Sequence, residues 1–188
     1  EMLRSLVGSE MCIRDSALLY DAGPRFGDFD TGERIVLPSL RALNVRRLDL
    51  LLLSHADNDH AGGAAAIKAG MPVSRVVSGE PQRLADALGA EACASGQSWQ
   101  WNEVTFRLWQ WQRAGSGNQL SCVLQIEAAG ERLLLTGDID VQAERALMQA
   151  DLPLASQWLL APHHGSRTSS SQAFIDAVAA RHLSLIHI

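Results

Sequence analysis

Residues 48–63 read LDLLLLSHADNDHAGG and join an apolar run to a dense group of polar side chains. The run over residues 48–53 has the length and composition of a buried strand. Two imidazoles and two carboxylates follow within six residues: His55, Asp57, Asp59 and His60. Nitrogen and carboxylate ligands spaced in this way can hold two divalent cations. A solvated turn with helix-capping aspartates is the alternative, but it would need only one histidine and one aspartate, so the pattern favours a metal site.

The histidines of the chain are grouped in a similar way. Between residues 17 and 181 there are four of them, and they form two clusters, His55 with His60 and His163 with His164. Histidines placed at random would seldom fall into two such groups. The second cluster follows another apolar run, at residues 158–161, which predicts a strand. Both clusters are therefore expected just after strands, where loops can converge at one edge of a sheet.

Apolar and alternating patterns predict the remaining elements. Strands are expected at residues 17–21, 48–53, 73–77 and 158–161, and a β-hairpin over residues 122–136 that turns at Ala129–Gly130. Helices are expected at residues 33–44 (with Pro38 weakening the first turn), 62–69, 81–89, from an N-cap at Asp140 to about residue 150, and from residues 169–171 onward. Strands and helices mixed around a hairpin block predict an α/β sandwich.

The composition predicts one globular domain. The chain has 188 residues, 47% of them hydrophobic and 20% charged, which allows a substantial core. No apolar run approaches the ~20 residues that span a bilayer, so no transmembrane helix is expected. The formal charge of −5 argues mildly against a broad nucleic-acid footprint. Two bound divalent cations would, however, add about four positive charges at the site itself.

The cysteines give little information. They lie at positions 12, 93 and 122, and none belongs to a C-x-x-C pair or neighbours a histidine. Zinc ligation by sulfur is therefore not expected. Cys93 and Cys122 could be buried thiols or a disulfide, and the sequence leaves both alternatives open.

Both ends of the chain differ in character from the part between them. Residues 1–16, EMLRSLVGSEMCIRDS, resemble the translated sequencing-adapter peptide that contaminates metagenomic gene predictions, and the final LSLIHI resembles the matching adapter. We therefore expect residues 1–16 and 182–188 to be artefacts and residues 17–181 to form the domain. The alternative for the first segment is an unusual N-terminal helix.

Three motifs resemble those of metallo-β-lactamase-fold hydrolases. HADNDHAGG, residues 55–63, is similar to their H-x-H-x-D-H signature, with Asp57 in the place of the second histidine. TGD at 136–138 and APHHGS at 161–166 resemble their later metal-binding loops. Together with LLYDAGP (18–24), GNQLSCVL (117–124), LLLTGDID (133–140) and PHHGSRTSS (162–170), the chain resembles the C-terminal domain of ComEC-type competence proteins, which are membrane proteins of bacterial DNA uptake.

The resemblance implies an αββα sandwich and a set of ligands for two metal ions. The usual opening D-V-G-Q-G motif and closing G-H-P motif are absent, so the first and last strands of the fold are expected to be missing. His55 and Asp57 match ligands of the first metal, Asp59, His60 and His164 match ligands of the second, and Asp138 matches the bridging carboxylate. Asp59 is also expected to orient the attacking water.

The resemblance leaves other roles open. His163 is a candidate for a substrate or supporting group, and Asn118 lies where simpler relatives carry a third histidine ligand of the first metal, although it is equally compatible with an ordinary loop residue. Ser166, Arg167 and Thr168 could bind a substrate phosphate near the start of the last helix, or simply cap that helix. Because Asp57 makes the first site richer in oxygen, we expect manganese to support activity at least as well as zinc.

The expected activity is hydrolysis of DNA phosphodiester bonds by water activated between two divalent metal ions, manganese or zinc. DNA and the membrane channel of a parent protein are the expected partners. That parent is expected in the bacterial inner membrane, with this domain in the periplasm or outside the cell. A hydrolase of small esters or lactams with the same fold is one alternative, because fold alone does not fix the substrate. A non-catalytic, metal-stabilised DNA-binding module is another.

Overall fold

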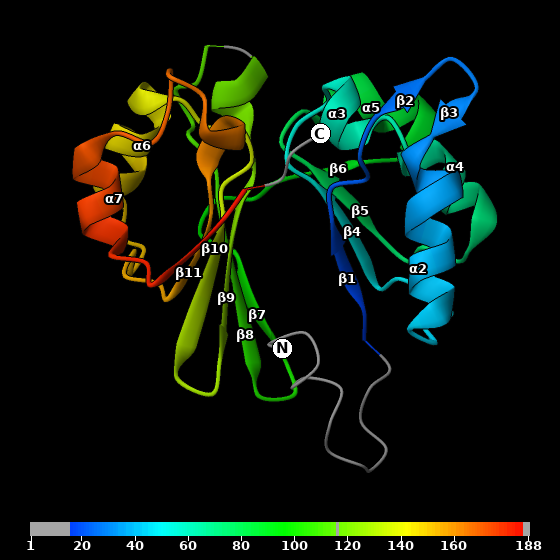
Figure 1. Cartoon of the computed structure of the whole chain (residues 1–188), viewed down its shortest axis with the longest axis horizontal. Helices are drawn as coiled ribbons and strands as arrows, with labels where there is room; N and C mark the ends of the chain where they lie inside the picture. Colours follow the sequence, from blue (N-terminus) through cyan, green and yellow to red (C-terminus); the bar gives the residue numbers. More distant parts are fainter. Residues whose placement is uncertain (1–15, 116, 186–188) are drawn as a thin grey trace.

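The computed structural model describes residues 16–115 and 117–185, which are arranged in four layers (Figure 1). Two β-sheets face each other in the middle, and helices cover the outer face of each sheet. The helices on one side are α2 (Leu37–Ala42), α4 (Ala64–Gly70) and α5 (Pro81–Leu88), and those on the other are α6 (Val141–Met148) and α7 (Gln172–Val178). The α/β sandwich expected from the sequence is therefore confirmed.

The first sheet is parallel throughout. Its spatial order, within the described residues, is β1 (Leu18–Tyr20), β4 (Leu50–Leu53), β5 (Val76–Ser78) and β6 (Glu91–Ala92). All four leucines of β4 are buried, as expected for a central parallel strand that is covered on both faces. The strand predicted at residues 73–77 begins later, at Val76, because Val73 makes only an isolated bridge to Leu48.

The second sheet is mixed. Its described strands run in the spatial order β12 (His182–Ser184), β11 (Trp158–Leu160), β10 (Glu131–Leu135), β9 (Val123–Ala128), β8 (Val104–Trp109) and β7 (Ser98–Trp101). The strands from β7 to β10 are antiparallel neighbours, whereas β10, β11 and β12 are parallel. β9 and β10 form the predicted hairpin, and both turn residues, Ala129 and Gly130, have positive φ. β12 lies within the segment expected to be an artefact, while residues 1–15 and 186–188 lie outside the described part.

Short elements lie in the loops between the longer strands and helices. They are the hairpin of β2 (Arg25–Phe26) and β3 (Phe29–Asp30), the π-helical turn η1 (Gly32–Val36), the single turn α3 (Asn58–Ala61), and the 3₁₀ turns η2 (Gly117–Leu120) and η3 (Pro162–Gly165). The single helix predicted over residues 33–44 is wrong in detail. It starts as η1 and becomes α-helical only at Leu37, with Pro38 in the first turn of α2, where no intrahelical N–H is lost.

Three hydrophobic clusters fill the spaces between the layers. The middle cluster lies between the two sheets and includes Leu52, Val77, Phe106 and Leu124. Cys93 and Cys122 belong to the same cluster and form a disulfide, with their Cα atoms 5.9 Å apart. Of the two states that the sequence left open, the structure therefore has the disulfide, and this bond joins the edge of the first sheet to the strand β9 of the second.

A glycine contact positions the loop after β4. A Cβ atom on Gly63 would lie 2.5 Å from the Ala22 carbonyl oxygen and 2.6 Å from the Gly32 nitrogen. Only glycine therefore lets the start of α4 pack directly on η1. No helix in the described ranges is both long and apolar enough to cross a membrane.

Candidate metal centre

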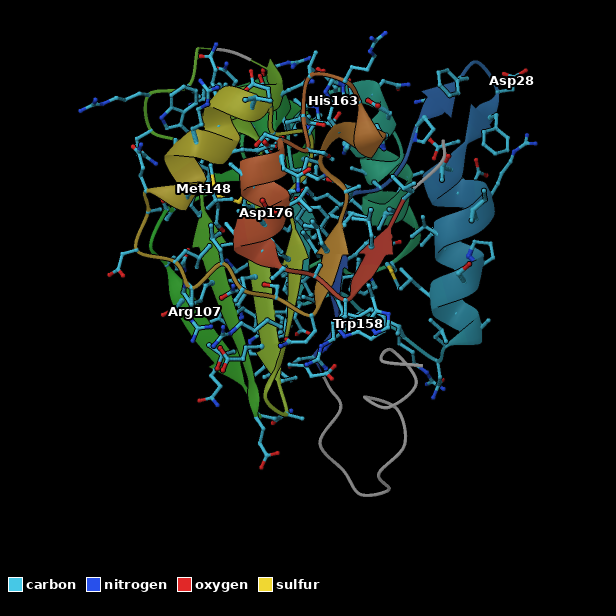
Figure 2. All side chains as sticks on the ribbon, turned by 60° about the vertical axis from the view of Figure 1, so that its left-hand side comes forward. Asp28, Arg107, Met148, Trp158, His163 and Asp176 are labelled. Atoms are coloured by element: carbon cyan, nitrogen blue, oxygen red, sulfur yellow. A yellow bond between two sulfur atoms is a disulfide. The ribbon has the colours of Figure 1, made fainter. Side chains whose placement is uncertain are left out.

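The predicted site residues lie at one end of the sandwich because they follow strands that end there. Asp21 follows β1, the loop from Ser54 to His60 follows β4, Asp138 follows β10, and His164 follows β11. Figure 2 places His163 at this end together with Asp28 of the β2–β3 hairpin, whereas Arg107 and Trp158 lie toward the opposite end.

Gly137 brings the loops of the two sheets into contact. Its φ is +58°, and a Cβ atom there would lie 2.7 Å from Ser54 Cβ and 3.0 Å from Ser121 Cβ. A larger residue would push the loop after β10 away from the loop after β4. The glycine of the TGD motif therefore sets how closely Asp138 approaches His60.

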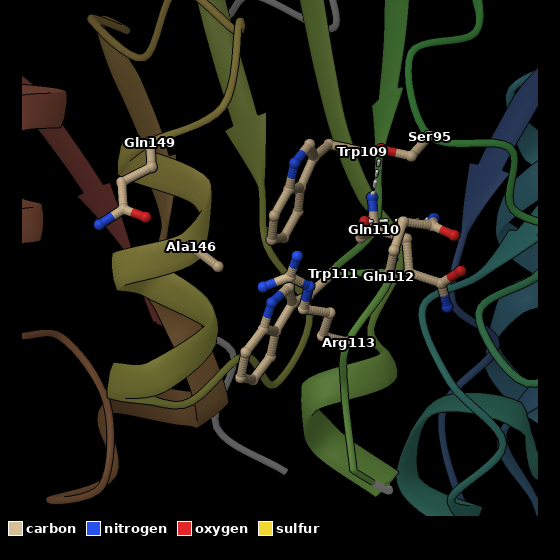
Figure 3. Close-up of a pocket in the computed structure, with 8 residues that line it drawn as sticks. All are labelled: Ser95, Trp109, Gln110, Trp111, Gln112, Arg113, Ala146 and Gln149. Carbon is tan, nitrogen blue, oxygen red and sulfur yellow. Dashed lines mark hydrogen bonds between the residues drawn. The ribbon is translucent and has the colours of Figure 1, made fainter.

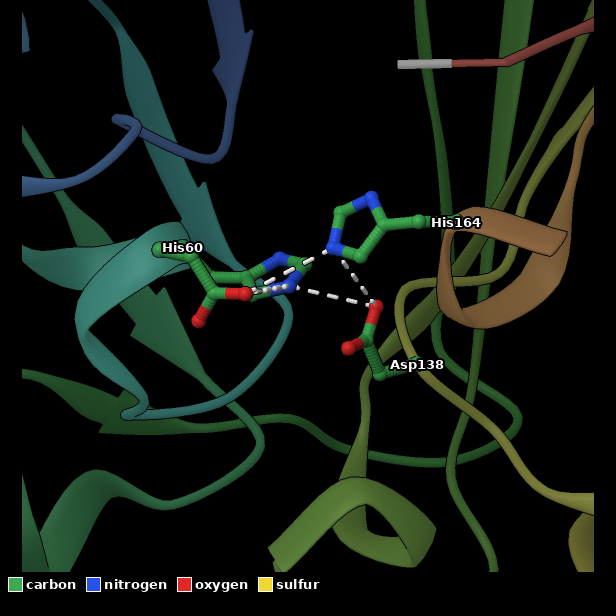
Figure 4. Close-up of side chains that lie close together, drawn as sticks. His60, Asp138 and His164 are labelled. Carbon is green, nitrogen blue, oxygen red and sulfur yellow. Dashed lines mark ion pairs between the residues drawn. The ribbon is translucent and has the colours of Figure 1, made fainter. Parts of the chain in front are cut away.

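Two carboxylates and two imidazoles form the centre of the site (Figure 4). One ligand atom from each of Asp59, His60, Asp138 and His164 lies within 4.8 Å of all the others. His60 Nε2 is 3.1 Å from Asp138 Oδ1 and 3.7 Å from Asp59 Oδ2. His164 Nε2 is 3.5 Å from Asp59 Oδ2 and 3.7 Å from Asp138 Oδ1. The arrangement brings together four predicted residues from three segments, the first and last of which are more than 100 residues apart.

Buried nitrogen atoms at this site are left without hydrogen bonds. Within the described part of the chain, the Nε2 atoms of His55, His60 and His164 are shielded from solvent and have no hydrogen-bond partner. His60 Nε2 approaches Asp138, but not with the geometry of a hydrogen bond. A buried polar atom without a partner costs free energy, and a metal ion would remove that cost. The donor set therefore fits a divalent cation bound by nitrogen and oxygen.

Asp21 orients His60. Its Oδ2 lies 2.8 Å from His60 Nδ1, and its two oxygens accept hydrogen bonds from the backbone N–H (2.6 Å) and the hydroxyl (3.0 Å) of Ser54. A carboxylate at this distance requires the proton of a neutral His60 to sit on Nδ1, which leaves Nε2 free as a ligand. The sequence analysis assigned no role to Asp21, although its position at the end of an apolar run, in LLYDAGP, was a usable signal.

The surroundings of His55 and His60 shift the pKa values of the two histidines in opposite directions. Burial lowers the pKa of His55, and the neighbouring His60 lowers it further. Burial also lowers the pKa of His60, but the carboxylates of Asp138 and Asp21 outweigh this effect and raise it to about 10. Burial opposes ionisation of Asp138, but the facing imidazole of His60 holds the pKa of Asp138 below its usual value. A proton on His60 thus occupies the place that a cation would take.

His55 and Asp57 form a second pair beside the centre. His55 is 1% exposed, and its ring centroid lies 4.3 Å from that of His60. Its Nε2 is 3.5 Å from Asp57 Oδ2, while the side chain of Asp57 remains 43% exposed. The pair could hold a cation next to the central one, as expected from the sequence.

His163 lies at the edge of the site and contacts Asn118. The side-chain nitrogen of Asn118 is 3.4 Å from the His163 ring, Thr168 Oγ1 is 3.3 Å from His163 Nδ1, and His163 Nε2 is 3.7 Å from Asp138 Oδ2. Asn118, His163 and Thr168 line an open pocket of about 410 Å³. Its other lining residues are Gly117, Gln119 and Asp140. Asn118 and His163 therefore face the space beside the carboxylates, where a substrate could bind.

The three candidate phosphate-binding residues lie in a turn and not in the last helix. Ser166, Arg167 and Thr168 follow η3, and α7 begins only at Gln172. At the start of that helix, Phe174 N–H donates to the Ser171 hydroxyl and Ser171 N–H donates to the Glu144 carboxylate.

A second pocket lies away from these residues. Its volume is about 280 Å³, and Trp109, Trp111 and Arg113 line it together with Ser95, Gln110, Gln112, Ala146 and Gln149 (Figure 3). None of the predicted site residues contributes to it. The chemically equipped space in the described part of the chain is therefore the one beside Asp138 and His163.

Comparison with known proteins gives concordant matches. A family model described as the Metallo-beta-lactamase superfamily matches residues 10–183. Competence protein ComA of Neisseria gonorrhoeae is 42% identical over 159 residues, which are 80% of this chain and 22% of that protein. Recombination protein 2 of Haemophilus influenzae is 30% identical over 167 residues, covering 86% and 20% of the two chains. ComE operon protein 3 of Bacillus subtilis is 30% identical over 161 residues, covering 78% and 21%.

The chain spans about a fifth of the length of these curated relatives. Among solved structures, a metallo-β-lactamase from Cronobacter sakazakii with a HARLDQ motif matches with a TM-score of 0.62 and 18% identity, over 90% of this chain and 82% of that chain. At this level of identity the likeness shows the fold alone.

Proposed function

Because the chain belongs to the metallo-β-lactamase superfamily, we propose that it is a metal-dependent hydrolase that cleaves DNA phosphodiester bonds in bacterial DNA uptake. The fold expected from the sequence is the fold of this superfamily. The resemblance to ComEC-type competence proteins is matched by relatives named for competence and recombination. The choice of DNA as the substrate rests on those relatives, because the fold itself serves many reactions.

The observation that carries the proposal is the convergence of Asp59, His60, Asp138 and His164 with partnerless buried imidazole nitrogens among them. A purely structural metal site closes around its ion with protein ligands. Here the side chain of Asp59 is 40% exposed and that of His164 is 29% exposed, so the site is open to solvent on one side. An open site of this kind favours catalysis over a structural role.

The residues of the chain would divide the work as follows. Asp59, His60, Asp138 and His164 would hold the central cation, and His55 with Asp57 would hold a second one. Divalent cations at these positions would supply an activated water and would stabilise negative charge on a phosphate. Asp59, whose Oδ2 faces both His60 and His164, would in addition orient the attacking water and act as its general base.

The substrate would enter from the pocket beside His163. The His163 ring and the Asn118 amide offer hydrogen-bond donors next to Asp138, and Thr168 supports the ring. Arg167 and Ser166 in the same turn are the groups that we propose for the DNA backbone, because phosphate contacts need cationic and hydroxyl side chains.

The same relatives support a proposal for the location of the domain. We propose that it belongs to a larger inner-membrane protein, that it faces the periplasm or the cell exterior, and that the membrane channel of the parent is its partner. The disulfide between Cys93 and Cys122 supports an oxidising compartment, because such bonds are rare in reducing cytosol.

The test is cleavage of linear DNA by metal-stripped protein to which manganese or zinc is added back. We expect manganese to support cleavage at least as well as zinc, and Asp59→Asn to lower the rate by about 100-fold or more, because general-base catalysis contributes at least this much. Asp86→Asn is the matched control, since it changes an exposed carboxylate on α5.

Three outcomes would contradict the proposal. Activity with zinc alone would contradict the manganese preference. Hydrolysis of small esters or lactams without cleavage of DNA would replace the nuclease by a small-molecule hydrolase. Stability that rises on metal addition, with DNA binding but no turnover of any substrate, would indicate a non-catalytic module.

A further inference from the structure

Asp57 is held by a cation from outside the histidine motifs. Its Oδ1 accepts a hydrogen bond from Arg83 Nη1 at 3.0 Å, while its Oδ2 lies 3.5 Å from His55 Nε2. Arg83 belongs to α5, which follows β5 and not β4. The two oxygens of Asp57 thus have different surroundings, one facing a guanidinium and the other facing the partnerless nitrogen of His55.

Glu80 fixes Arg83 and the loop that carries Asp57. Glu80 is 8% exposed, and its Oε2 accepts hydrogen bonds from Arg83 Nη1 at 2.9 Å and from the Ala56 backbone N–H at 3.0 Å. The same nitrogen of Arg83 therefore joins a buried carboxylate to Asp57. Glu80 also accepts the backbone N–H of Ala56, the residue before Asp57. The Glu80 carboxylate therefore holds both the backbone of the loop and, through Arg83, the side chain of Asp57.

This arrangement compensates for the aspartate in the motif. A histidine at position 57 would be a neutral ligand with one nitrogen directed at the metal, whereas a carboxylate has two equivalent oxygens and can bind through either or both. Arg83 removes this freedom by occupying Oδ1.

We infer that Arg83 is a positioning residue, which holds one oxygen of Asp57 and so directs the other toward His55 to complete the first cation site. The inference rests on the proposed function, because it assumes that His55 and Asp57 bind a cation. It adds to that function a role for Arg83, which enables Asp57 to serve as a ligand in the place of the second histidine of the motif.

The inference can be tested by the direction in which the affinity for the cation changes when Arg83 is replaced. Removing a positive charge near a cation site should strengthen cation binding if Arg83 is only an electrostatic neighbour. If Arg83 positions Asp57, its removal should weaken binding instead. The two roles therefore predict opposite results for Arg83→Gln.

The measurement is calorimetric titration of the metal-stripped full chain with Mn²⁺. We expect two bound ions in the wild type, and in Arg83→Gln a loss of about 10- to 100-fold in affinity at one of the two sites, as is typical when a group that orients a ligand is removed. Arg83→Lys, which keeps a cationic N–H donor, should lose less. In an Asp57→Asn background, Arg83→Gln should cause no further loss.

Arg75→Gln is the matched control. Arg75 is as exposed as Arg83 and pairs with Glu91 at 2.7 Å. It should leave the affinity at both sites unchanged. Metal-free Arg83→Gln should remain folded at the titration temperature, with a lowered melting temperature because Glu80 loses its cationic partner. A variant that is unfolded at that temperature would make Arg83 a structural residue and would contradict the inference.

Failure of the inference can be told from failure of the proposed function. If the wild type binds two ions and cleaves DNA, but Arg83→Gln binds both as tightly or more tightly, the positioning role is wrong and the hydrolase stands. If the wild type itself binds no ion and cleaves nothing, the proposed function is wrong.

Discussion

His163 and His164 reach the site from an unusual backbone conformation. Their φ angles are 47° and 52°, in the left-handed region that non-glycine residues adopt at a cost of about 1–3 kcal/mol each. The Gly137 carbonyl accepts the His163 N–H at 3.1 Å, and the Pro162 carbonyl accepts the Ser169 hydroxyl at 2.8 Å. These contacts hold the strained turn, which directs both imidazoles toward Asp138.

Metal binding should release a proton from His60. Its pKa of about 10 means that the metal-free site is protonated at neutral pH, whereas the lowered pKa of His55 leaves that ring neutral. A bound cation needs an unprotonated Nε2, so about one proton should be released per protein near pH 8, and affinity should rise about tenfold per pH unit below the raised pKa.

Titration of metal-stripped protein with Mn²⁺ in two buffers of different ionisation enthalpy measures this number directly. Asp21→Asn removes a carboxylate that raises the pKa of His60, so this variant should release fewer protons. It should also bind the ion more weakly, because the His60 ring loses the carboxylate that orients it. The same apparent binding enthalpy in both buffers for the wild type would mean that no proton is released, and would contradict a protonated His60 in the metal-free site.

The candidate metal-binding residues are easier to recognise in the sequence than the residues that orient them. His55, Asp57, Asp59 and His60 form a compact motif, so the sequence alone identifies them as a group. The role of Asp21 depends on a contact between residues 39 positions apart, which exists only because β1 and β4 are neighbours in the sheet. The strained turn at His163 likewise has no local signal, since neither histidine favours positive φ as glycine does.

Glu144 joins α6 to the start of α7. It is fully buried, and its carboxylate accepts hydrogen bonds from the N–H groups of Ser170 and Ser171, the latter at 3.0 Å. These residues directly follow the turn that carries the candidate phosphate-binding side chains. Glu144 thereby adds a polar contact between the two helices on the outer face of the second sheet, which also share a hydrophobic cluster.

Glu144→Ala should lower the free energy of unfolding by about 3 kcal/mol, because two buried N–H groups lose a charged acceptor. Arg145→Ala is the control on the same helix and, being exposed, should change it by less than about 0.5 kcal/mol. Urea unfolding of both variants gives the values. A Glu144→Ala variant that is as stable as the control would contradict this expectation and show that water accepts the two N–H groups in place of the carboxylate.

Local signals predicted the elements, and long-range contacts decided their ends. The hairpin at residues 122–136 was predicted correctly because its turn residues and alternation are local. The N-cap at Asp140 was also correct, since its carboxylate accepts the N–H groups of Gln142 and Ala143. The last helix starts within the predicted range, because Ser171 is its N-cap and the Ser171 hydroxyl accepts the N–H of Phe174. The bonds from the N–H groups of Ser170 and Ser171 to Glu144 are long-range contacts that no local pattern contains.

The two sheets are joined by one core and one covalent bond. The middle hydrophobic cluster takes residues from both sheets, and the disulfide between Cys93 and Cys122 crosses the same space. The sequence could not decide between thiols and a disulfide, because the pairing depends on a Cα separation that only the folded sandwich creates. The residues of the candidate metal centre follow strands of both sheets, so the relative position of the sheets matters for the site.

Removal of the disulfide by Cys93→Ser with Cys122→Ser should lower the free energy of unfolding by about 2–4 kcal/mol, the range expected for bonds of this kind. A reductant should bring the wild type to the same stability and should leave the double variant unchanged. Thermal or urea unfolding with and without reductant provides the comparison. Equal stability of all four samples would mean that the bond does not contribute.

The central claim is that residues from both sheets converge on a two-cation centre. Anomalous diffraction from crystals soaked in Mn²⁺ tests it most directly, because it locates the ions without reference to any substrate. We predict one peak among Asp59, His60, Asp138 and His164, and a second beside His55 and Asp57. An absence of peaks at these residues, with Mn²⁺ bound elsewhere or not at all, would contradict the account.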